Sequence, residues 1–247
     1  MTPHGMPDWG VIGQHIQVYT LDDMAELAAR LGSPVVYDRR GDVLWIDTWR
    51  DGMWGLTTGG SGLGNAVELI VGSPGQSPYS VRLTAGSTIG RSATVFRNQA
   101  VGFESVMGLE AWIWLAGNNQ YVTLQLTRAY PPLYVSGRIR IDPVNDVLAY
   151  YNAAGGYTDF AADMGWDPTP AGGSVLKLVV DFQTRTYERV ILDGVTYLLS
   201  GIGLRVEAYA GTPVTQVNLT NVSNVAVNGA VLLGTMILTQ NEPVSQT

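Results

Sequence analysis

The sequence contains no cysteine, two histidines and a single lysine, Lys177. Without cysteine the chain has no disulfides, no thiolate metal ligands and no cysteine nucleophile. Zinc needs several His or Cys ligands, which this chain cannot supply from His4 and His15 alone. A Ser-His-Asp triad would need one of these two residues as its base. The composition therefore argues against zinc enzymes and against thiol or serine nucleophiles.

Long apolar runs and excess positive charge are also missing. No stretch approaches roughly 18 uninterrupted apolar residues, and the first 17 residues lack a basic region followed by an apolar one. We therefore expect neither a membrane span nor a secretory signal. The net charge of −7 argues against nucleic acid as a partner, because such binding needs clustered cations. Only 14% of residues are charged, which favours association with partners over a highly charged monomer.

The strongest pattern in the chain is alternation of apolar and polar residues, clearest from Ser174 to Ser200. It predicts three successive strands, with a polar turn after the first and the two-residue turn Asp193-Gly194 after the second. Both residues of that turn tolerate positive φ. Simple alternation places Tyr187, Arg189 and Ile191 on one face of the middle strand. The expected strands are 174–182, 187–192 and 195–199.

The same alternation recurs from about Ala66 onward, in roughly a dozen short strands separated by turn signals. A chain of this length can bury one large core. These features predict an all-β, two-sheet antiparallel sandwich. Gly59–Gly64 is expected to be a flexible turn, and 153–173 to be mostly loop. The other expected strands are 66–71, 79–84, 101–116, 121–127, 133–142, 147–151, 204–208 and 231–238.

The order of elements in 174–200 resembles the meander of concanavalin-A-like and laminin-G-like jelly rolls. There, an apolar strand, a polar turn, a strand ending in Asp-Gly and a further strand lie on one sheet of a sandwich. The resemblance implies a jelly-roll sandwich over residues 56–241. It concerns an architecture and implies little about function.

Ahead of the sandwich, the sequence predicts two smaller parts. Residues 1–19 are turn-rich and are expected to form an extended arm, which a neighbouring molecule could order. Residues 20–55 are expected to form a helix plus a β-hairpin, and 242–247 a frayed tail. The helix begins at the capping residue Thr20 and ends at Gly32. Its apolar stripe fits core packing or a subunit contact. The residues expected in assembly are His4, Trp9, His15, Leu21, Met24 and Leu27.

The segment Leu21–Asp47, LDDMAELAARLGSPVVYDRRGDVLWID, is similar to uncharacterised phage-type structural proteins. This resemblance covers barely a tenth of the chain. It implies a structural role in a virus or phage particle. Such a protein is made in the cytoplasm without a signal peptide and reaches the exterior as part of a virion or particle surface.

Catalytic carboxylates are not evident. Retaining glucanases of this architecture carry Glu-x-Asp-x-(x)-Glu on one strand, which places two carboxylates about 5 Å apart. The nearest candidates here, Glu104 and Glu110, would lie roughly 20 Å apart along a regular strand. The expectation is therefore a non-enzymatic protein.

Calcium remains possible as a cofactor, because it needs only oxygen ligands. The turn at 142–146 and the loop at 159–167 carry several aspartates. Neither has EF-hand spacing, although laminin-G-like domains bind calcium without one fixed local motif. Solvated turn acids are the alternative interpretation. The weak candidates are Asp142, Asp146, Asp159 and Asp163.

Aromatic residues are the remaining candidates for a ligand site. Exposed Trp and Tyr stack on sugar rings and also anchor protein interfaces, whereas paired Trp on a strand often belong to a core. The candidate ligand-binding residues are Trp112, Trp114, Tyr150, Tyr151, Tyr157 and Trp166.

Two functions follow from these observations. The first is a non-enzymatic structural or decoration protein of a virus- or phage-like particle. It would assemble as a homo-oligomer and contact other particle proteins through its arm and sandwich surfaces. The alternative is a carbohydrate-binding, lectin-like module or adhesin that binds glycan through the aromatic residues. A divergent glycosidase is a distant third.

Overall fold

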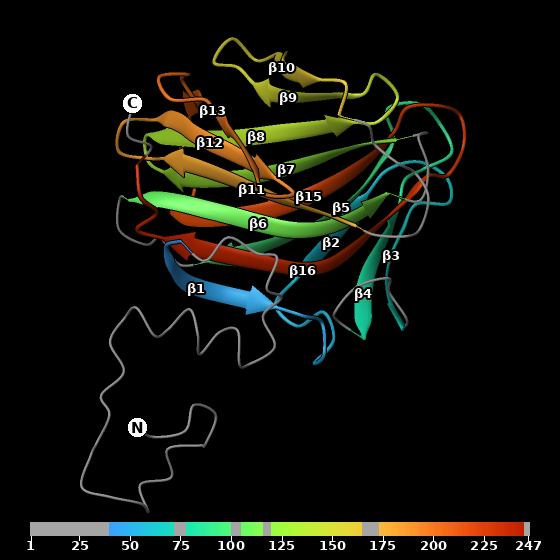
Figure 1. Cartoon of the computed structure of the whole chain (residues 1–247). Helices are drawn as coiled ribbons and strands as arrows, with labels where there is room; N and C mark the ends of the chain where they lie inside the picture. Colours follow the sequence, from blue (N-terminus) through green and yellow to red (C-terminus); the bar gives the residue numbers. More distant parts are fainter. Residues whose placement is uncertain (1–39, 72–77, 100–104, 116–119, 165–172, 245–247) are drawn as a thin grey trace, which may run out of the picture. The chain divides into compact units, whose positions relative to one another are not determined.

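The computed structural model describes residues 40–71, 78–99, 105–115, 120–164 and 173–244. The chain divides into two compact units, Met1–Arg39 and Arg40–Thr247. The described residues all belong to the second unit and form two antiparallel β-sheets of eight strands each, packed as a sandwich (Figure 1). They contain no helix, and therefore none that could cross a membrane. The helix expected from Thr20 to Gly32 lies outside the described residues.

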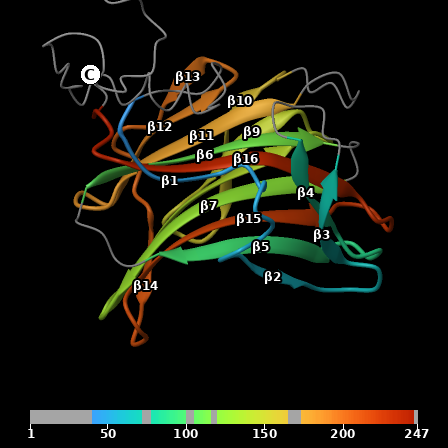
Figure 2. The same cartoon turned by 90° about the horizontal axis from the view of Figure 1, so that it is seen from below.

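The first sheet, sheet A, has the strand order β13-β12-β11-β6-β16-β4-β3, and β1 also pairs with β16. Figure 2 shows it stacked on the other sheet. Its strands are β13 (Val195–Leu198), β12 (Thr186–Leu192), β11 (Ser174–Asp181), β6 (Val106–Leu115), β16 (Ala230–Gln240), β4 (Tyr79–Thr84), β3 (Ala66–Val71) and β1 (Asp42–Asp47).

The second sheet, sheet B, has the order β10-β9-β8-β7-β15-β5-β2, and β14 also pairs with β8. Long central strands, β7 and β15, pair over ten residues. The strands are β10 (Tyr157–Ala162), β9 (Val147–Tyr151), β8 (Leu133–Asp142), β7 (Gln120–Tyr130), β15 (Val214–Ser223), β5 (Ser92–Gln99), β2 (Thr57–Gly60) and β14 (Arg205–Ala208).

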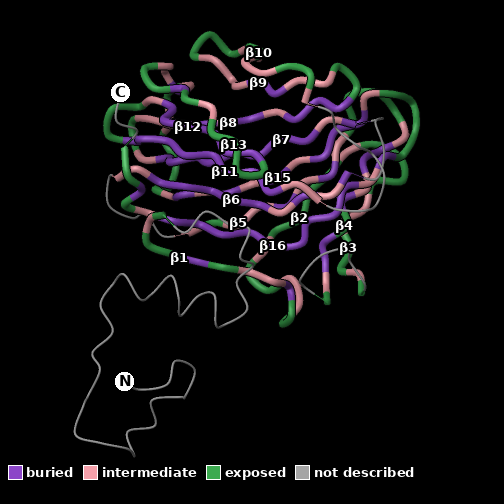
Figure 3. Tube along the Cα trace, in the orientation of Figure 1, coloured by how far each residue is buried: buried purple, intermediate pink, exposed green. Residues whose placement is uncertain are grey.

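Alternation along the strands builds the core, as the sequence predicts. On β7, Val122, Leu124 and Leu126 are fully buried and pack in the core cluster. On β6, Leu109 and Ile113 face the same core from sheet A. Figure 3 shows buried segments along the strands and exposed ones at the turns. Hydrophobic burial between the two sheets therefore holds the sandwich together.

The expected three-stranded meander is present as β11, β12 and β13. Asp193 and Gly194 join the last two strands with φ of 47° and 84°, as expected for a two-residue turn. The predicted face of Tyr187 is wrong. A register shift between Val179 and Val180 places an extra residue, Glu188, in β12. This β-bulge reverses the alternation, so Tyr187 lies in the core while Arg189 lies on the outer face.

Three further expectations differ from the structure. Asp42–Asp47, expected in a module separate from the sandwich, is strand β1 of sheet A and pairs with β16. Gly59 and Gly60, expected in a flexible turn, belong to β2 and pair with β5. The region 153–173, expected to be mostly loop, also contains a strand, β10, which forms a hairpin with β9. The strands β1 and β2 pair with strands far away in the sequence, and the pairing of β10 with β9 has a register shift between Asp159 and Ala161. In each case the pairing overrides a weak local sequence pattern.

Candidate ligand-binding site

The outer face of sheet B, which points away from the core, is polar across its centre. Strand register places Phe96, Asn218, Gln125 and Arg138 side by side on neighbouring strands. Gln125 is only 5% exposed, although it points outward.

Hydrogen bonds order this polar row. The Gln125 amide nitrogen donates to Thr127 Oγ1 at 2.8 Å and to the Tyr134 hydroxyl at 3.1 Å. Its amide oxygen accepts from Asn218 Nδ2 at 3.3 Å. Asn218 Oδ1 is buried and has no hydrogen-bond partner within the described part of the chain. The row therefore holds fixed amides and one acceptor without a donor.

Beside the amides, tyrosine rings and arginine side chains form a continuous series of ring and cation–π contacts, which we call the Arg–Tyr ladder. The Arg138 guanidinium lies 4.5 Å from the Tyr151 ring centre, and the Tyr151 and Tyr157 rings are 5.1 Å apart. The Arg140 guanidinium lies 4.5 Å from Tyr157 and 5.6 Å from Tyr121. Cation–π contacts of this kind hold guanidinium planes in fixed positions. Burial raises the pKa of the Tyr121 phenol, with a smaller contribution from Tyr157.

A residue of sheet A supports the ladder from inside the core. The Tyr187 hydroxyl accepts a hydrogen bond from the Arg138 amide at 2.9 Å. It also lies within donating distance of the carbonyls of Tyr151, at 2.8 Å, and of Arg138, at 3.2 Å. Burial raises the pKa of Tyr187 above its ordinary value of 10.0, so this phenol stays protonated. One buried hydroxyl thus fixes the backbone under both an arginine and a tyrosine of the ladder.

Glycine allows the two sheets to approach closely beside Tyr187. A Cβ at Gly137 would lie 2.6 Å from Val180 Cγ1, which is too close, and 3.5 Å from Tyr187 Cε1, which is an ordinary van der Waals contact. A side chain at position 137 would therefore displace Val180 of β11.

The two ladder arginines differ in their surroundings. Arg140 lies 3.9 Å from Asp142 and 3.8 Å from Asp159, so two carboxylates compensate its charge. Arg138 forms no ion pair with any described residue, and its Nε is buried without a hydrogen-bond partner there. The ladder therefore carries one compensated and one uncompensated cation.

These contacts also bear on the calcium candidates. An arginine, rather than an open space for a metal, lies between Asp142 and Asp159, and Asp142 additionally accepts from Asn145 Nδ2 at 2.9 Å. Asp146 and Asp163 have left-handed backbone conformations, each with φ of 55°. Among the described residues, no group of three or more His, Cys, Asp or Glu could hold a metal ion.

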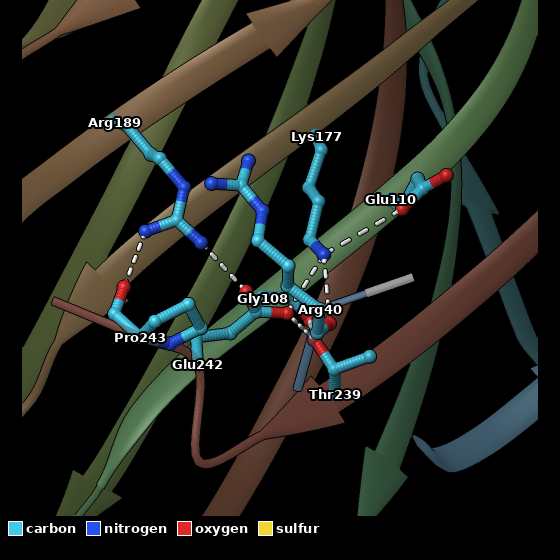
Figure 4. Close-up of polar contacts among 8 residues, drawn as sticks. All are labelled: Arg40, Gly108, Glu110, Lys177, Arg189, Thr239, Glu242 and Pro243. Carbon is cyan, nitrogen blue, oxygen red and sulfur yellow. Dashed lines mark hydrogen bonds and ion pairs between the residues drawn. The ribbon is translucent and has the colours of Figure 1, made fainter. Parts of the chain in front are cut away.

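A second polar cluster lies on the outer face of sheet A (Figure 4). Lys177 Nζ is 2.7 Å from Glu242 and 3.8 Å from Glu110, and Arg189 is 2.7 Å from Glu242. Lys177 also donates to the carbonyl of Arg40 at 3.2 Å. All four charged side chains are at most 3% exposed, so this cluster stabilises the fold and does not face a solvent ligand. Glu242, expected at the start of a frayed tail, is therefore buried and tied to two strands.

The candidate aromatic residues do not form one group. Tyr151 and Tyr157 belong to the Arg–Tyr ladder, whereas Tyr150 packs toward the core against Phe160 and Tyr187. Trp112 and Trp114 lie on β6 of the opposite sheet, partly buried. The Trp112 ring covers Gly234, which sits at a bulge of β16 opposite it. The remaining candidate, Trp166, and the six assembly residues, His4, Trp9, His15, Leu21, Met24 and Leu27, lie outside the described residues.

The sequence analysis missed the ladder residues Arg138, Arg140 and Tyr121. The signal that could have found the arginines is their spacing of two on β8, which places both on the polar face. Their tyrosine partners come from other strands, so no local pattern indicates the contacts of the Arg–Tyr ladder.

No known protein family matches this sequence, and no curated protein matches it. Its fold is nevertheless similar to that of several solved structures. One is a carbohydrate esterase from a Shiga toxin-encoding bacteriophage, with a TM-score of 0.54 and 16% identity over 82% of this chain and 100% of that one. Another is a Bacillus subtilis protein of unknown function with a galectin-like fold, with a TM-score of 0.55 and 9% identity over 81% and 97%.

A third is the metal-free lectin I-B4 of Griffonia simplicifolia, with a TM-score of 0.50 and 9% identity over 80% of this chain and 98% of that one. All three similarities extend over most of both chains. The described part of the chain therefore has the lectin- and galectin-like jelly-roll fold, in agreement with the concanavalin-A-like architecture that the sequence predicts.

Proposed function

We propose that this protein is a non-catalytic carbohydrate-binding protein that binds glycan on the outer face of sheet B. The observation that carries the proposal is the Arg–Tyr ladder beside the ordered amides of Gln125 and Asn218. Amides and guanidinium groups donate to sugar hydroxyls, and tyrosine supplies apolar surface for the sugar ring. The ladder and the hydroxyl of Tyr187 hold these groups in place before any ligand arrives.

Two structural neighbours support carbohydrate as the class of ligand, since one is a lectin and the other is a bacteriophage carbohydrate esterase. The outer face of sheet A suits a ligand less well. Four of its charged residues are buried in the Lys177 cluster, and the ring of Trp112 is packed on Gly234.

A glycan array probed with the full chain tests the proposal, followed by thermal unfolding with the best glycan. Saturating ligand at about 100 times Kd adds roughly 2.7 kcal/mol to the free energy of unfolding. We expect Tyr157→Ala, in the ladder, to abolish this gain, and Trp114→Ala, an aromatic truncation on the opposite sheet, to retain it. The proposal fails if no glycan binds. The proposed position of the site on sheet B is wrong if Trp114→Ala loses glycan binding and Tyr157→Ala retains it.

A second candidate is a structural or decoration protein on the surface of a phage-like particle. The bacteriophage origin of one structural neighbour favours it. In this case the chain forms a homo-oligomer through residues 1–19, and glycan binding on sheet B would serve the same particle. Light scattering compares the full chain with a chain lacking residues 1–19. A defined oligomer that becomes a monomer on truncation supports this candidate, and two monomers contradict it.

A further inference from the structure

Arg138 is the charged group of the ladder that has no counter-charge among the described residues. Its Nε is buried, while its remaining guanidinium nitrogens make no hydrogen bond in the described part of the chain. Arg140, two residues along the same strand, is flanked by Asp142 and Asp159 instead. The two arginines therefore offer an internal comparison between a satisfied and an unsatisfied cation.

We propose that Arg138 selects sugars that carry a carboxylate, such as uronic or sialic acids; this inference rests on the carbohydrate-binding function proposed above. A guanidinium binds a carboxylate with two parallel hydrogen bonds, and its charge makes each of them stronger than a neutral one. Stacking on Tyr151 fixes the guanidinium plane, which lowers the entropy cost of forming that pair.

The neighbouring groups extend this selectivity to the rest of the sugar. Gln125 lies directly across from Arg138 on β7, and Asn218 lies across from Gln125 on β15. Asn218 is only partly buried, and its Oδ1 has no hydrogen-bond partner among the described residues, so it can accept a hydrogen bond from a sugar hydroxyl once the side chain rotates toward the surface. A carboxylate at Arg138 and a hydroxyl at Asn218 would satisfy both groups with one ligand.

The negative net charge of the chain bears on how an acidic sugar could bind. The net charge is −7, so general attraction does not draw an anionic glycan to this protein. Binding of an acidic sugar therefore requires a local cation, and a partly buried guanidinium without a counter-ion supplies one. The interaction is electrostatic in part, so it weakens as ionic strength rises.

Calorimetric titration with oligogalacturonate and with its methyl-esterified form tests this inference, because esterification removes the charge and leaves the sugar rings. Sialyllactose and lactose make a second pair, and a sulfated oligosaccharide serves as an anion without carboxylate. We expect wild type to bind an acidic member at least about tenfold more tightly than its neutral counterpart, with the difference reduced in high salt.

The variants assign the effect to one residue. Arg138→Gln is expected to remove the acid preference, and Arg138→Lys to retain part of it because the charge remains without the planar fork. Arg82→Gln is the matched control, since it removes one arginine from an exposed ion pair on sheet A and should leave the preference unchanged. Near-ultraviolet circular dichroism checks that each variant is folded.

The outcomes separate this inference from the proposed function. Equal binding of acidic and neutral members, in wild type and in Arg138→Gln, overturns the acid selectivity while glycan binding stands. Preference for the sulfated sugar over both carboxylated ones also overturns it. An acid preference that survives in Arg138→Gln shows that another group is responsible, and absence of all glycan binding removes both proposals.

Discussion

Replacing the single lysine of the chain is the sharpest test of how the structure is stabilised. Lys177 Nζ contacts Glu242 at 2.7 Å and Glu110 at 3.8 Å, and the side chain of each of the three is at most 1% exposed. Lys177→Met keeps most of the side-chain volume and removes only the charge and its hydrogen bonds. Two buried carboxylates then lose the cation that they share, while Glu242 keeps its ion pair with Arg189.

The expected cost is large, because an uncompensated buried charge is far less stable than a solvated one. Breaking a buried ion pair by removing one partner costs about 3–5 kcal/mol. A typical domain has a free energy of unfolding of only about 5–15 kcal/mol, so this is a substantial fraction. For a chain of this size the melting temperature should fall by roughly 6–20 °C.

Urea denaturation followed by tryptophan fluorescence measures the change. Arg82→Gln is the control, because Arg82 and Glu68 form an ion pair with side chains 45% and 48% exposed. Such surface pairs contribute about 0–1 kcal/mol. The double variant Lys177→Met/Glu110→Gln should recover part of the loss, since it removes the charge of one buried carboxylate and leaves the Glu242–Arg189 pair intact. If Lys177→Met costs no more than the control, the cluster is not buried and paired as described, and the reasoning is wrong.

Three other predictions follow from the same structure. An amine-reactive reagent should modify Lys177 only on unfolding, because this side chain is 1% exposed; modification of the native protein, read by peptide mass spectrometry, would contradict this. Gly234→Ala should destabilise the protein and alter its fluorescence, because a Cβ there overlaps the ring of Trp112, whereas Gly59→Ala, with open space around it, should do neither. Tyr187→Phe should cost about 1–3 kcal/mol, because the Arg138 amide loses its partner. Because burial raises the pKa of Tyr187 in the folded state, the unfolded state loses this proton first as the pH rises. The difference in free energy of unfolding between wild type and Tyr187→Phe should therefore shrink above about pH 10. A difference that stays constant with pH would refute this.

Local patterns determined much of the fold. Alternation over 174–182 and the positive-φ turn at Asp193-Gly194 give the meander without reference to any other strand, because side chains on a strand point to opposite faces in turn. The hydrophobic face of β7 follows from the same period. Once enough strands of this kind are present, burial of their apolar faces requires a second sheet.

Two ladder residues, Tyr151 and Tyr157, were candidates from the sequence, but the tertiary structure decided how the candidate site is assembled. The ladder joins Tyr121 of β7, Arg138 of β8 and Tyr157 of β10, and only the order and register of strands in sheet B bring them together. A β-bulge in β12 turned Tyr187 into the core, against simple alternation. Glu242 is buried because its carboxylate meets Lys177 from β11. Alternation is a local property that can be read directly from a sequence. Register and ion pairing depend on which distant strands lie next to each other, and the packing of the whole core determines that order.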